Sequence, residues 1–194
     1  MLVIMKKLHS IDIIEKVAKR NKSIKEFKFV AYHYVPQALT DKGRTKFYLI
    51  KRNPITTFTK RIQAIRIPEG WSFAILSEVR LMNDKKQYIP QIDFQCSVSG
   101  KNINLIKKRL SEIVKVFPGY ILKSGNSYHY IGIKLLNKEK FIEFIGNCLL
   151  CNIPGDKFTL VDTRWFGHAL RNGYACLRIF KNIIRPEPEI VAFI

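Results

Sequence analysis

The sequence has few acidic residues, few cysteines and no long apolar run, and each shortage excludes a class of protein. Of its 194 residues, 15 are Asp or Glu against 34 Lys or Arg, which gives a formal net charge of +19. Such an excess costs self-repulsion unless a polyanion offsets it. The charge therefore disfavours a purely structural role and favours nucleic acid as the partner, with an anionic membrane surface second.

The scarcity of cysteine and of apolar stretches bears on the compartment. The four cysteines are unevenly spaced and fit no disulfide framework, so we expect a reduced, intracellular, cytoplasmic protein. No run of 18 apolar residues occurs, so no transmembrane helix is expected. Met1–Met5 is too short for a signal peptide, and lysines follow it rather than precede it. A membrane is therefore not the expected partner.

The first half of the chain predicts a helix followed by strands. Hydrophobic residues make up 47% of the sequence, enough for a sizeable core. Ser10 is a candidate N-cap for a helix over residues 11–18. A basic linker is expected over residues 19–28, and strand character over residues 29–81. Apolar residues of one parity between Trp71 and Val79 predict a half-buried strand.

The second half shows a more regular alternation of strands and helices. Its expected elements are a strand at 88–96, a helix at 103–117, strands at 120–124 and 127–135 joined by Gly125-Asn126, a helix at 137–150 and a strand at 173–180. This order is the split β-α-β-β-α-β pattern of a ferredoxin-like or RRM-like sheet. In that topology the first and third strands are neighbours.

The predicted fold class is therefore α+β. We expect an RRM-like core over residues 71–182, packed with an N-terminal module of one helix plus β-rich structure over residues 1–70. Residues 183–194 are expected to form an extended C-terminal tail.

The first polar cluster lies on the strand expected at 88–96. Gln91, Asp93 and Gln95 share one face of that strand. A buried carboxylate in a central strand needs a partner or a metal ion. Asp93 is thus a candidate metal ligand, and the alternative is that it pairs with one of the many Lys or Arg residues.

The second polar cluster lies on the neighbouring strand, where Ser127 and His129 share one face. A hydroxyl and an imidazole placed side by side can bind a phosphate, whereas a lone His is more often a hydrogen-bonded structural residue. Ile131 has the same parity as His129. Either the strands of residues 29–81 cover this face, or the strand bulges after Tyr130.

The third cluster begins at Asp162. If residues 164–171 form a short helix, Arg164, His168 and Arg171 lie on one face at i, i+4 and i+7. An acid followed by a stripe of cations suits a site that holds both a metal ion and a triphosphate. The alternative is an N-capping Asp followed by a solvated basic face.

These clusters, in this order and on this topology, resemble the archaeo-eukaryotic primase (primase-polymerase) superfamily. The motifs of that family are hydrophobic-Asp-x-Asp/Glu on one strand, Ser-x-His on a later strand and a third acid after it. The matching segments are Gln91–Gln95, Ser124–Tyr130 and Val161–Arg164. A small-residue turn leading into Ser-x-His is the most telling of them. The resemblance covers about Trp71–Phe180 and implies an RRM-like catalytic core.

The resemblance also implies roles for individual residues. Asp93 and Asp162 would be catalytic residues that hold a divalent metal, Mg²⁺ or Mn²⁺. Ser127 and His129 would contact the phosphates of an incoming nucleotide. The cations of the third cluster would add phosphate contacts, which follows from their chemistry more than from a motif: Arg164, His168 and Arg171.

One residue departs from the family pattern. Gln95 stands where the second acid of the first motif is expected, and a neutral amide oxygen is a weak ligand for a hard cation. A weakened or inactive enzyme is one interpretation of this change. Glu78 on the preceding strand is a candidate for the missing carboxylate.

The Cys148-x-x-Cys151 pair is a candidate zinc ligand set. A structural zinc site uses four Cys or His ligands, usually as two close pairs, and here there is no second pair. We therefore expect core cysteines, and zinc is not an expected cofactor.

The predicted function is a metal-dependent, primase-polymerase-like nucleotidyltransferase that uses nucleoside triphosphates on a single-stranded DNA or RNA template. At this size of chain, a separate helicase or accessory replication subunit is an expected partner. The alternative is a non-catalytic, basic RRM-like nucleic-acid-binding module, with Phe94, Tyr128 and Tyr130 available to stack bases. A nuclease ranks last, because no Glu-x-Lys follows Asp93 at a suitable distance.

Overall fold

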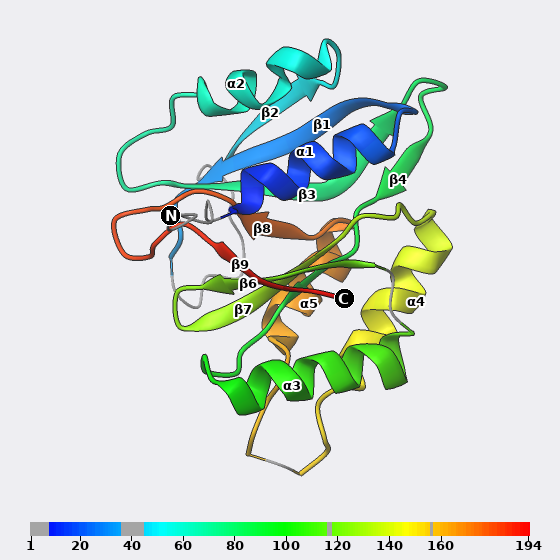
Figure 1. Cartoon of the computed structure of the whole chain (residues 1–194), viewed down its shortest axis with the longest axis vertical. Coiled ribbons are helices and arrows are strands. Elements are labelled where there is room, and N and C mark those ends of the chain that lie inside the picture. The colour runs from blue at the N-terminus through cyan, green and yellow to red at the C-terminus, as the bar shows by residue number, and fades with distance from the viewer. Residues whose placement is uncertain (1–7, 36–44, 116–117, 156) are drawn as a thin grey trace, which may run out of the picture.

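The chain forms a mixed α+β structure with two antiparallel sheets (Figure 1). The computed structural model describes residues 8–35, 45–115, 118–155 and 157–194. The elements are α1 Ser10–Arg20, β1 Ile24–Tyr32, β2 Thr45–Lys51, η1 Ile55–Thr57, α2 Phe58–Gln63, β3 Ser72–Leu81, β4 Lys86–Tyr88, β5 Gln91–Asp93, α3 Gly100–Arg109, η2 Leu110–Val114, β6 Gly119–Ser124, β7 Ser127–Gly132, α4 Lys138–Leu149, α5 Thr163–Asn172, β8 Cys176–Arg178 and β9 Glu189–Phe193.

The first sheet has the strand order β2-β1-β3-β4, with β8 also paired to β3. The second sheet has the order β5-β7-β6-β9. The predicted α+β class is confirmed, and so is the hairpin of β6 and β7, in which Gly125 takes a φ of +69° that suits glycine in a tight turn.

The second sheet is compatible with the split β-α-β-β-α-β pattern. Its order β5-β7-β6 places the first and third strands of that pattern side by side, as predicted. A fourth strand would lie on the other side of β5, and a short bridge between Phe94 and Val161 occupies that position. The strand expected at residues 173–180 was assigned wrongly to this sheet, because β8 pairs with β3 in the first sheet.

The strand predicted at residues 88–96 is two strands in two different sheets. β4 ends at Tyr88 in the first sheet, and β5 begins at Gln91 in the second. Pro90 lies between them and has no amide hydrogen to donate to a ladder, which favours a break at this point. Its carbonyl still accepts the N–H of Gly132 at 2.8 Å, so the break leads directly into the pairing with β7.

Other expectations for the N-terminal half need correction. The basic linker expected over residues 19–28 is in fact the end of α1, a short connection and the start of β1. The lysines of β1 reach acids on neighbouring segments: Lys25 lies 2.8 Å from Asp84, and Lys28 lies 3.6 Å from Glu78. The N-cap of α1 is His9 rather than Ser10. β3 is buried on both faces for most of its length rather than half-buried. Phe73 and Ile75 on one face lie in the core with α1 and α2, and Ala74 and Leu76 on the other face pack with Tyr174 and Cys176.

The helices of the second half lie close to their expected positions. α3 continues into a π-helical turn, η2, and then residues 116–117 fall outside the described residues. α4 begins after Asn137, whose side chain accepts the N–H of Lys140 at 2.8 Å. The expected extended tail contains β9, which pairs with β6 and completes the second sheet.

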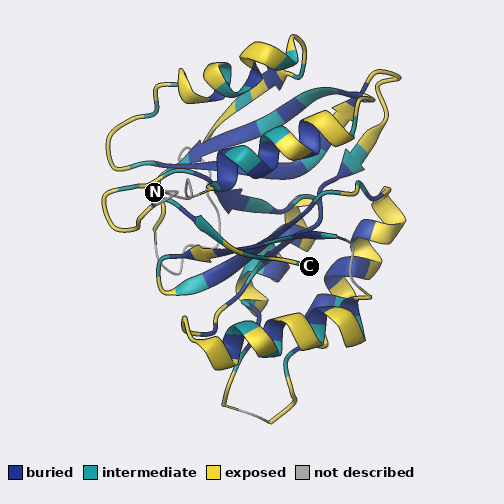
Figure 2. Cartoon of the chain, in the orientation of Figure 1, coloured by how far each residue is buried: buried dark blue, intermediate teal, exposed yellow. Residues whose placement is uncertain are grey.

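Two apolar cores explain how the layers pack. One lies between the second sheet and α3, α4 and α5. The other joins the opposite face of the second sheet to α1, α2 and the first sheet, and it contains both Ile131 and Phe29. The expectation that the strands of residues 29–81 cover the face of His129 is thus confirmed. Figure 2 shows the resulting buried residues along the strands of both sheets.

The first sheet crosses the boundary predicted at residue 70, since β1 pairs with both β2 and β3. The division into residues 1–70, 71–182 and 183–194 stays a prediction. Across the described parts of the chain, no helix combines the length and the apolar character needed to cross a membrane.

Candidate active site

Asp93 and His129 form the centre of the candidate site. They are directly opposite each other in the antiparallel pairing of β5 with β7. Asp93 Oδ1 lies 3.4 Å from His129 Nε2. The side chain of Asp93 is 27% exposed and that of His129 is 7% exposed. Because Ile92 and Phe94 point into the helix-side core, Asp93 and His129 lie on the face turned toward the first sheet.

Asp162 reaches the same place from a third segment. Its backbone N–H donates to the carbonyl of Asp93 at 3.1 Å. Its side chain caps α5, where Oδ1 accepts the N–H of Trp165 at 3.0 Å. The two interpretations of Asp162 are therefore compatible, since a capping carboxylate has a second oxygen that can face a cation.

Burial and neighbouring charges shift the pKa values of both Asp93 and His129. Burial raises the pKa of Asp93 to about 7, and the negative charge of Asp162 adds to this, while Arg185 and Arg178 oppose it. Burial also lowers the pKa of His129 to about 3, helped by the positive charges of the same two arginines. At neutral pH the imidazole is therefore uncharged and Asp93 is partly protonated.

Arg178 is a site residue that the sequence analysis missed. It lies on β8, is almost fully buried, and uses Nη1 to donate to the carbonyls of Phe180 and Pro186, each at 2.6 Å. Its Nη2 donates to Ser124 Oγ at 3.0 Å. Arg178 thereby ties β8 both to the β6–β7 hairpin and to the C-terminal segment. An arginine inside the apolar run Cys-Leu-Arg-Ile-Phe was a usable signal, because a buried cation needs partners.

Arg185 is the second missed cation, and a closed turn sets its position. Asn182 Oδ1 accepts the N–H of Arg185 at 2.7 Å, and the Asn182 amide donates to Ser72 Oγ at 2.9 Å. A Cβ placed on Gly125 would lie 3.5 Å from the Arg185 side chain, so this arginine lies against the β6–β7 turn. From the sequence this segment was expected to be an extended tail without a role in the site.

The hydroxyl of Ser127 is engaged within the sheet. It donates to the carbonyl of Phe94 and so links β7 to the chain just beyond β5. Its predicted contact with a nucleotide phosphate stays a prediction. The bond fixes the start of β7, two residues before His129.

The three cations of the third cluster lie on α5 as expected. The helix extends over Thr163–Asn172, and Phe166 and Ala169 form its buried side. Arg164 and Arg171 are exposed and His168 is half-buried. Arg164 is in the first turn beside Asp162, whereas Arg171 is about 10 Å further along the helix axis. Their nucleotide-binding roles stay predictions.

No second carboxylate of the first motif lies beside Asp93, at either position 95 or Glu78. Gln95 is exposed just beyond β5, and its N–H donates to the carbonyl of Leu160 at 2.9 Å. Glu78 is instead engaged by Lys86 at 2.9 Å and by Lys28 at 3.6 Å. The carboxylates that the structure brings together are those of Asp93 and Asp162.

This donor set suits one class of metal ion. No cluster of three or more His, Cys, Asp and Glu side chains arranged to hold a metal occurs in the described ranges. Two carboxylates without further protein ligands fit Mg²⁺ or Mn²⁺, which keep waters and share substrate phosphate oxygens. Cys148 and Cys151 are both buried in the helix-side core, where we expected them.

The aromatic residues proposed for base stacking are not accessible. Phe94, Tyr128 and Tyr130 are all buried in the core between the second sheet and the helices. The Tyr128 hydroxyl donates to the carbonyl of Ser99 at 3.0 Å. The suggestion that these rings stack bases is therefore wrong, because α3, α4 and α5 cover the face on which they lie.

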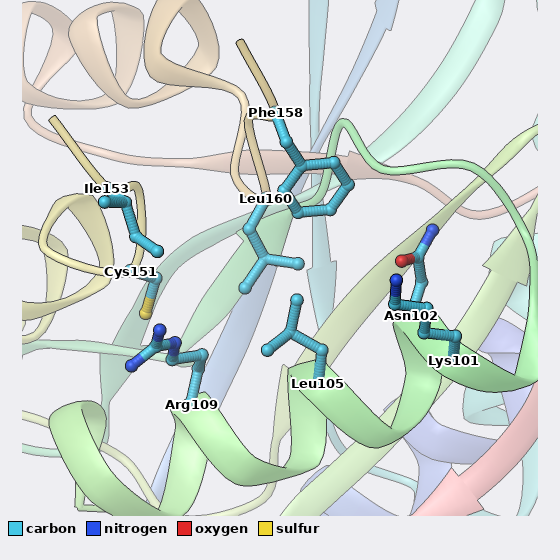
Figure 3. A pocket seen from close by; sticks show the side chains of 8 residues that line it. All are labelled: Lys101, Asn102, Leu105, Arg109, Cys151, Ile153, Phe158 and Leu160. Carbon is cyan, nitrogen blue, oxygen red and sulfur yellow. The ribbon is translucent and has the colours of Figure 1, made fainter. Parts of the chain in front are cut away.

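A cavity of about 360 Å³ lies on that same helix side (Figure 3). Asp93 and His129 lie on the opposite face of the second sheet. α3 and the segment after α4 form its walls. It is lined by Lys101, Asn102, Leu105, Arg109, Cys151, Ile153, Phe158 and Leu160. None of these residues belongs to the candidate site.

Comparison with known families identifies the family of the chain. The sequence profile of the family described as AEP-like, archaeo-eukaryotic primase 1D-like, matches residues 51–187, which is more than half of the chain. The chain belongs to this family. The resemblance inferred from the three motifs is thereby confirmed. No curated protein and no solved structure gives a significant match.

Membership of the AEP-like family establishes the general class of function. The chain is primase-like, in the class of nucleotidyltransferases, and the family indicates interaction with nucleic acid and nucleotides in general. The match includes β3, β5, β7, α5 and β8, which carry or support the candidate site.

The shifted pKa of Asp93 predicts a pH-dependent stability difference between the wild type and Asp93→Asn without metal. Between about pH 4 and about pH 7 the folded wild type holds a proton on Asp93 that the unfolded chain has lost. The contribution of Asp93 to stability is therefore highest below about pH 4 and falls as the pH rises to about 7. Asn has no such titration, so the variant should gain stability relative to the wild type over this range.

Urea denaturation of both proteins from pH 4 to pH 8 measures this difference. The opposite pH dependence from His129 contributes to both proteins and largely cancels in the comparison. A stability difference that stays constant over the whole range would contradict the shifted pKa.

Proposed function

We propose that this chain is a divalent-metal-dependent nucleotidyltransferase that adds nucleotides from nucleoside triphosphates on a single-stranded DNA or RNA template. The observation that carries the proposal is the convergence of Asp93, His129 and Asp162. These residues come from three separate clusters of the sequence and meet on one side of the second sheet.

The paired acids are proposed to hold the metal. Asp93 and Asp162 repel one another when both are ionised, which is one reason that Asp93 retains its proton to about pH 7. A divalent cation favours the ionised form of both carboxylates. Bound Mg²⁺ or Mn²⁺ would neutralise triphosphate charge and activate the attacking hydroxyl.

His129 and two arginines are proposed to receive the phosphates. The Nδ1 atom of His129 is buried and has no hydrogen-bond partner among the described residues. Left unpaired, such an atom costs about 1–3 kcal/mol, and a neutral imidazole with its proton on Nδ1 would recover this by donating to a phosphate oxygen. Arg178 and Arg185 supply the positive potential at this position. Arg164, His168 and Arg171 are proposed to bind further along the nucleotide, and Ser127 at its phosphates.

A non-catalytic member of the family that binds nucleic acid is the second candidate. The observation that favours it is Gln95, a neutral side chain in the position of the second acid. A separate helicase or accessory replication subunit is a proposed partner in either case.

Loss of one acid tests the catalytic proposal. We expect the wild type to incorporate nucleotides on a single-stranded template with Mg²⁺ or Mn²⁺, as measured by product length on a denaturing gel. Asp93→Asn should lower this activity by at least a hundredfold, because it removes a charged metal ligand.

Asp84→Asn is the matched control: Asp84 is an exposed acid paired with Lys25, so activity should be unchanged. Equal activity of Asp93→Asn and the wild type would exclude the proposed role, and a wild type without any product would leave the non-catalytic candidate.

A second variant separates nucleotide binding from template binding. His129→Ala removes the imidazole proposed to meet the phosphates, so triphosphate affinity should fall roughly tenfold to a hundredfold. Calorimetry with Mn²⁺ and a non-hydrolysable triphosphate measures this affinity, and oligonucleotide binding should be unchanged. His33→Ala, at an exposed histidine, is the control. Unaltered triphosphate affinity in His129→Ala would contradict the assignment.

A further inference from the structure

One face of the first sheet exposes apolar side chains on an edge strand. β2 alternates, and its Tyr48 and Ile50 side packs on the core shared with α1 and α2. On the opposite side Phe47 is 47% exposed and Leu49 is 60% exposed. A single exposed apolar residue is ordinary, whereas two neighbours on a strand of an otherwise strongly basic protein suggest a contact surface.

The exposed ring of Phe47 is part of an aromatic and cationic group. Tyr174, from the segment that leads into β8, meets Phe47 edge to face at a centroid distance of 6.4 Å. Lys28 on β1 places its Nζ 5.5 Å from the ring centre of Phe47 and 5.9 Å from that of Tyr174. We call Lys28, Phe47, Leu49 and Tyr174 the β2 platform. Two aromatic rings with a cation between them are the components with which proteins bind single strands.

The β2 platform is continuous with the candidate active site. Tyr174 and Cys176 pack together against Val30 and Leu76 on this face of the first sheet. Arg178 follows two residues after Cys176 and lies opposite Ala74 in the pairing of β8 with β3. Cys176 and Arg178 are alternate residues of β8 and share this face, and Tyr174 packs on it just before the strand begins. The four residues from Tyr174 to Arg178 span at most about 13 Å of extended chain, and the charge of Arg178 acts on Asp93.

The charges around the β2 platform select a polyanion. Four cations belong to this face, and its two acids are already paired. The acid Glu26 lies 3.4 Å from Arg80, and the acid Glu78 pairs with Lys28 and Lys86. The fourth cation, Lys51, is exposed on β2 opposite Glu26. The net charge of this face is therefore positive, as it is for the whole chain. An apolar protein partner would account for the exposed Phe47 and Leu49 but not for this excess.

We propose that the β2 platform is a docking site for single-stranded nucleic acid, with bases stacking on Phe47 and phosphates held by the surrounding lysines, and that it delivers the strand toward Arg178 and Asp93. The delivery rests on the proposed function, whereas the docking itself needs neither metal nor nucleotide. A loss of docking and a loss of catalysis are therefore measured separately.

The test is binding of a fluorescent oligothymidylate, followed by anisotropy without metal or nucleotide. Phe47→Ala should weaken binding about fivefold to a hundredfold, the range for loss of one stacked base. Phe47→Trp should retain the wild-type affinity, because a larger ring stacks as well. Lys28→Ala should reduce the slope of log affinity against log salt by about 0.7, the contribution of one phosphate contact, whereas Phe47→Ala should leave that slope unchanged.

Phe193→Ala is the matched control. Phe193 is 56% exposed on β9 in the second sheet, and it contacts the ring of Tyr120, over which Lys16 lies. It thus has the same combination of aromatic and cation on another surface. The proposal is supported if Phe47→Ala weakens binding and Phe193→Ala does not. It is overturned if Phe47→Ala binds as tightly as the wild type, or if both alanine variants lose affinity equally.

Asp93→Asn keeps the two proposals apart. It should bind the oligothymidylate as the wild type does, since Asp93 is not part of the β2 platform. Failure of synthesis in Asp93→Asn with normal docking then concerns the active site alone. If the oligothymidylate no longer binds Asp93→Asn but still binds Phe47→Ala, the proposed role of the β2 platform is overturned. The nucleic acid would then bind at the acids instead.

Discussion

The register between β5 and β7 is the constraint on which the site depends. It sets Asp93 opposite His129 and turns both toward the first sheet. A slip of one residue would exchange the two faces of β5, move Asp93 into the helix-side core and bring Ile92 or Phe94 into the site. The apolar alternation of β5 and β7 prevents such a slip, because each face has its own buried layer. The packing of the sheet and the position of the acid are therefore set by the same residues.

The charges at the site are not arranged to maximise the stability of the folded chain. Asp93 is largely withdrawn from water next to another carboxylate, and burial together with the charges of Arg178 and Arg185 keeps His129 uncharged. Each of these costs free energy in the unliganded chain. Such groups are common where a protein binds charged ligands, since a cation relieves the acids and an anion relieves the arginines. The site thus contains adjacent anionic and cationic halves, which suits a metal-bound triphosphate.

The sequence was sufficient for the central part of this arrangement. The two extended runs separated only by Gly125-Asn126 predicted the hairpin, and the order of elements predicted that Asp93 and His129 would lie on neighbouring strands. The sequence was not sufficient where strands pair over a very short length or over a long separation in the chain. Phe94 makes a single bridge with Val161, too short to leave a strand pattern in the sequence, although this bridge brings Asp162 to Asp93.

Long-range placement explains the remaining differences. β8 was recognisable as a strand, but the choice of β3 as its partner depends on the packing of the whole chain, so Arg178 received no role. Pro90 could be noted in the sequence, yet whether it ends a strand or begins one depends on which sheet each side joins. The lysines of β1 suggested a linker because their partners, Asp84 and Glu78, are more than 45 residues away in the chain.

The most direct test of the acid pair is Mn²⁺ binding followed by electron paramagnetic resonance of the free ion at pH 8, where Asp93 is ionised. Asp93→Asn and Asp162→Asn each remove one charge, and Asn at position 162 still caps α5 well. We expect one Mn²⁺ site in the wild type, with an affinity at least tenfold lower in either variant. Mn²⁺ binding of equal strength in the wild type and both variants would contradict a metal site at Asp93 and Asp162.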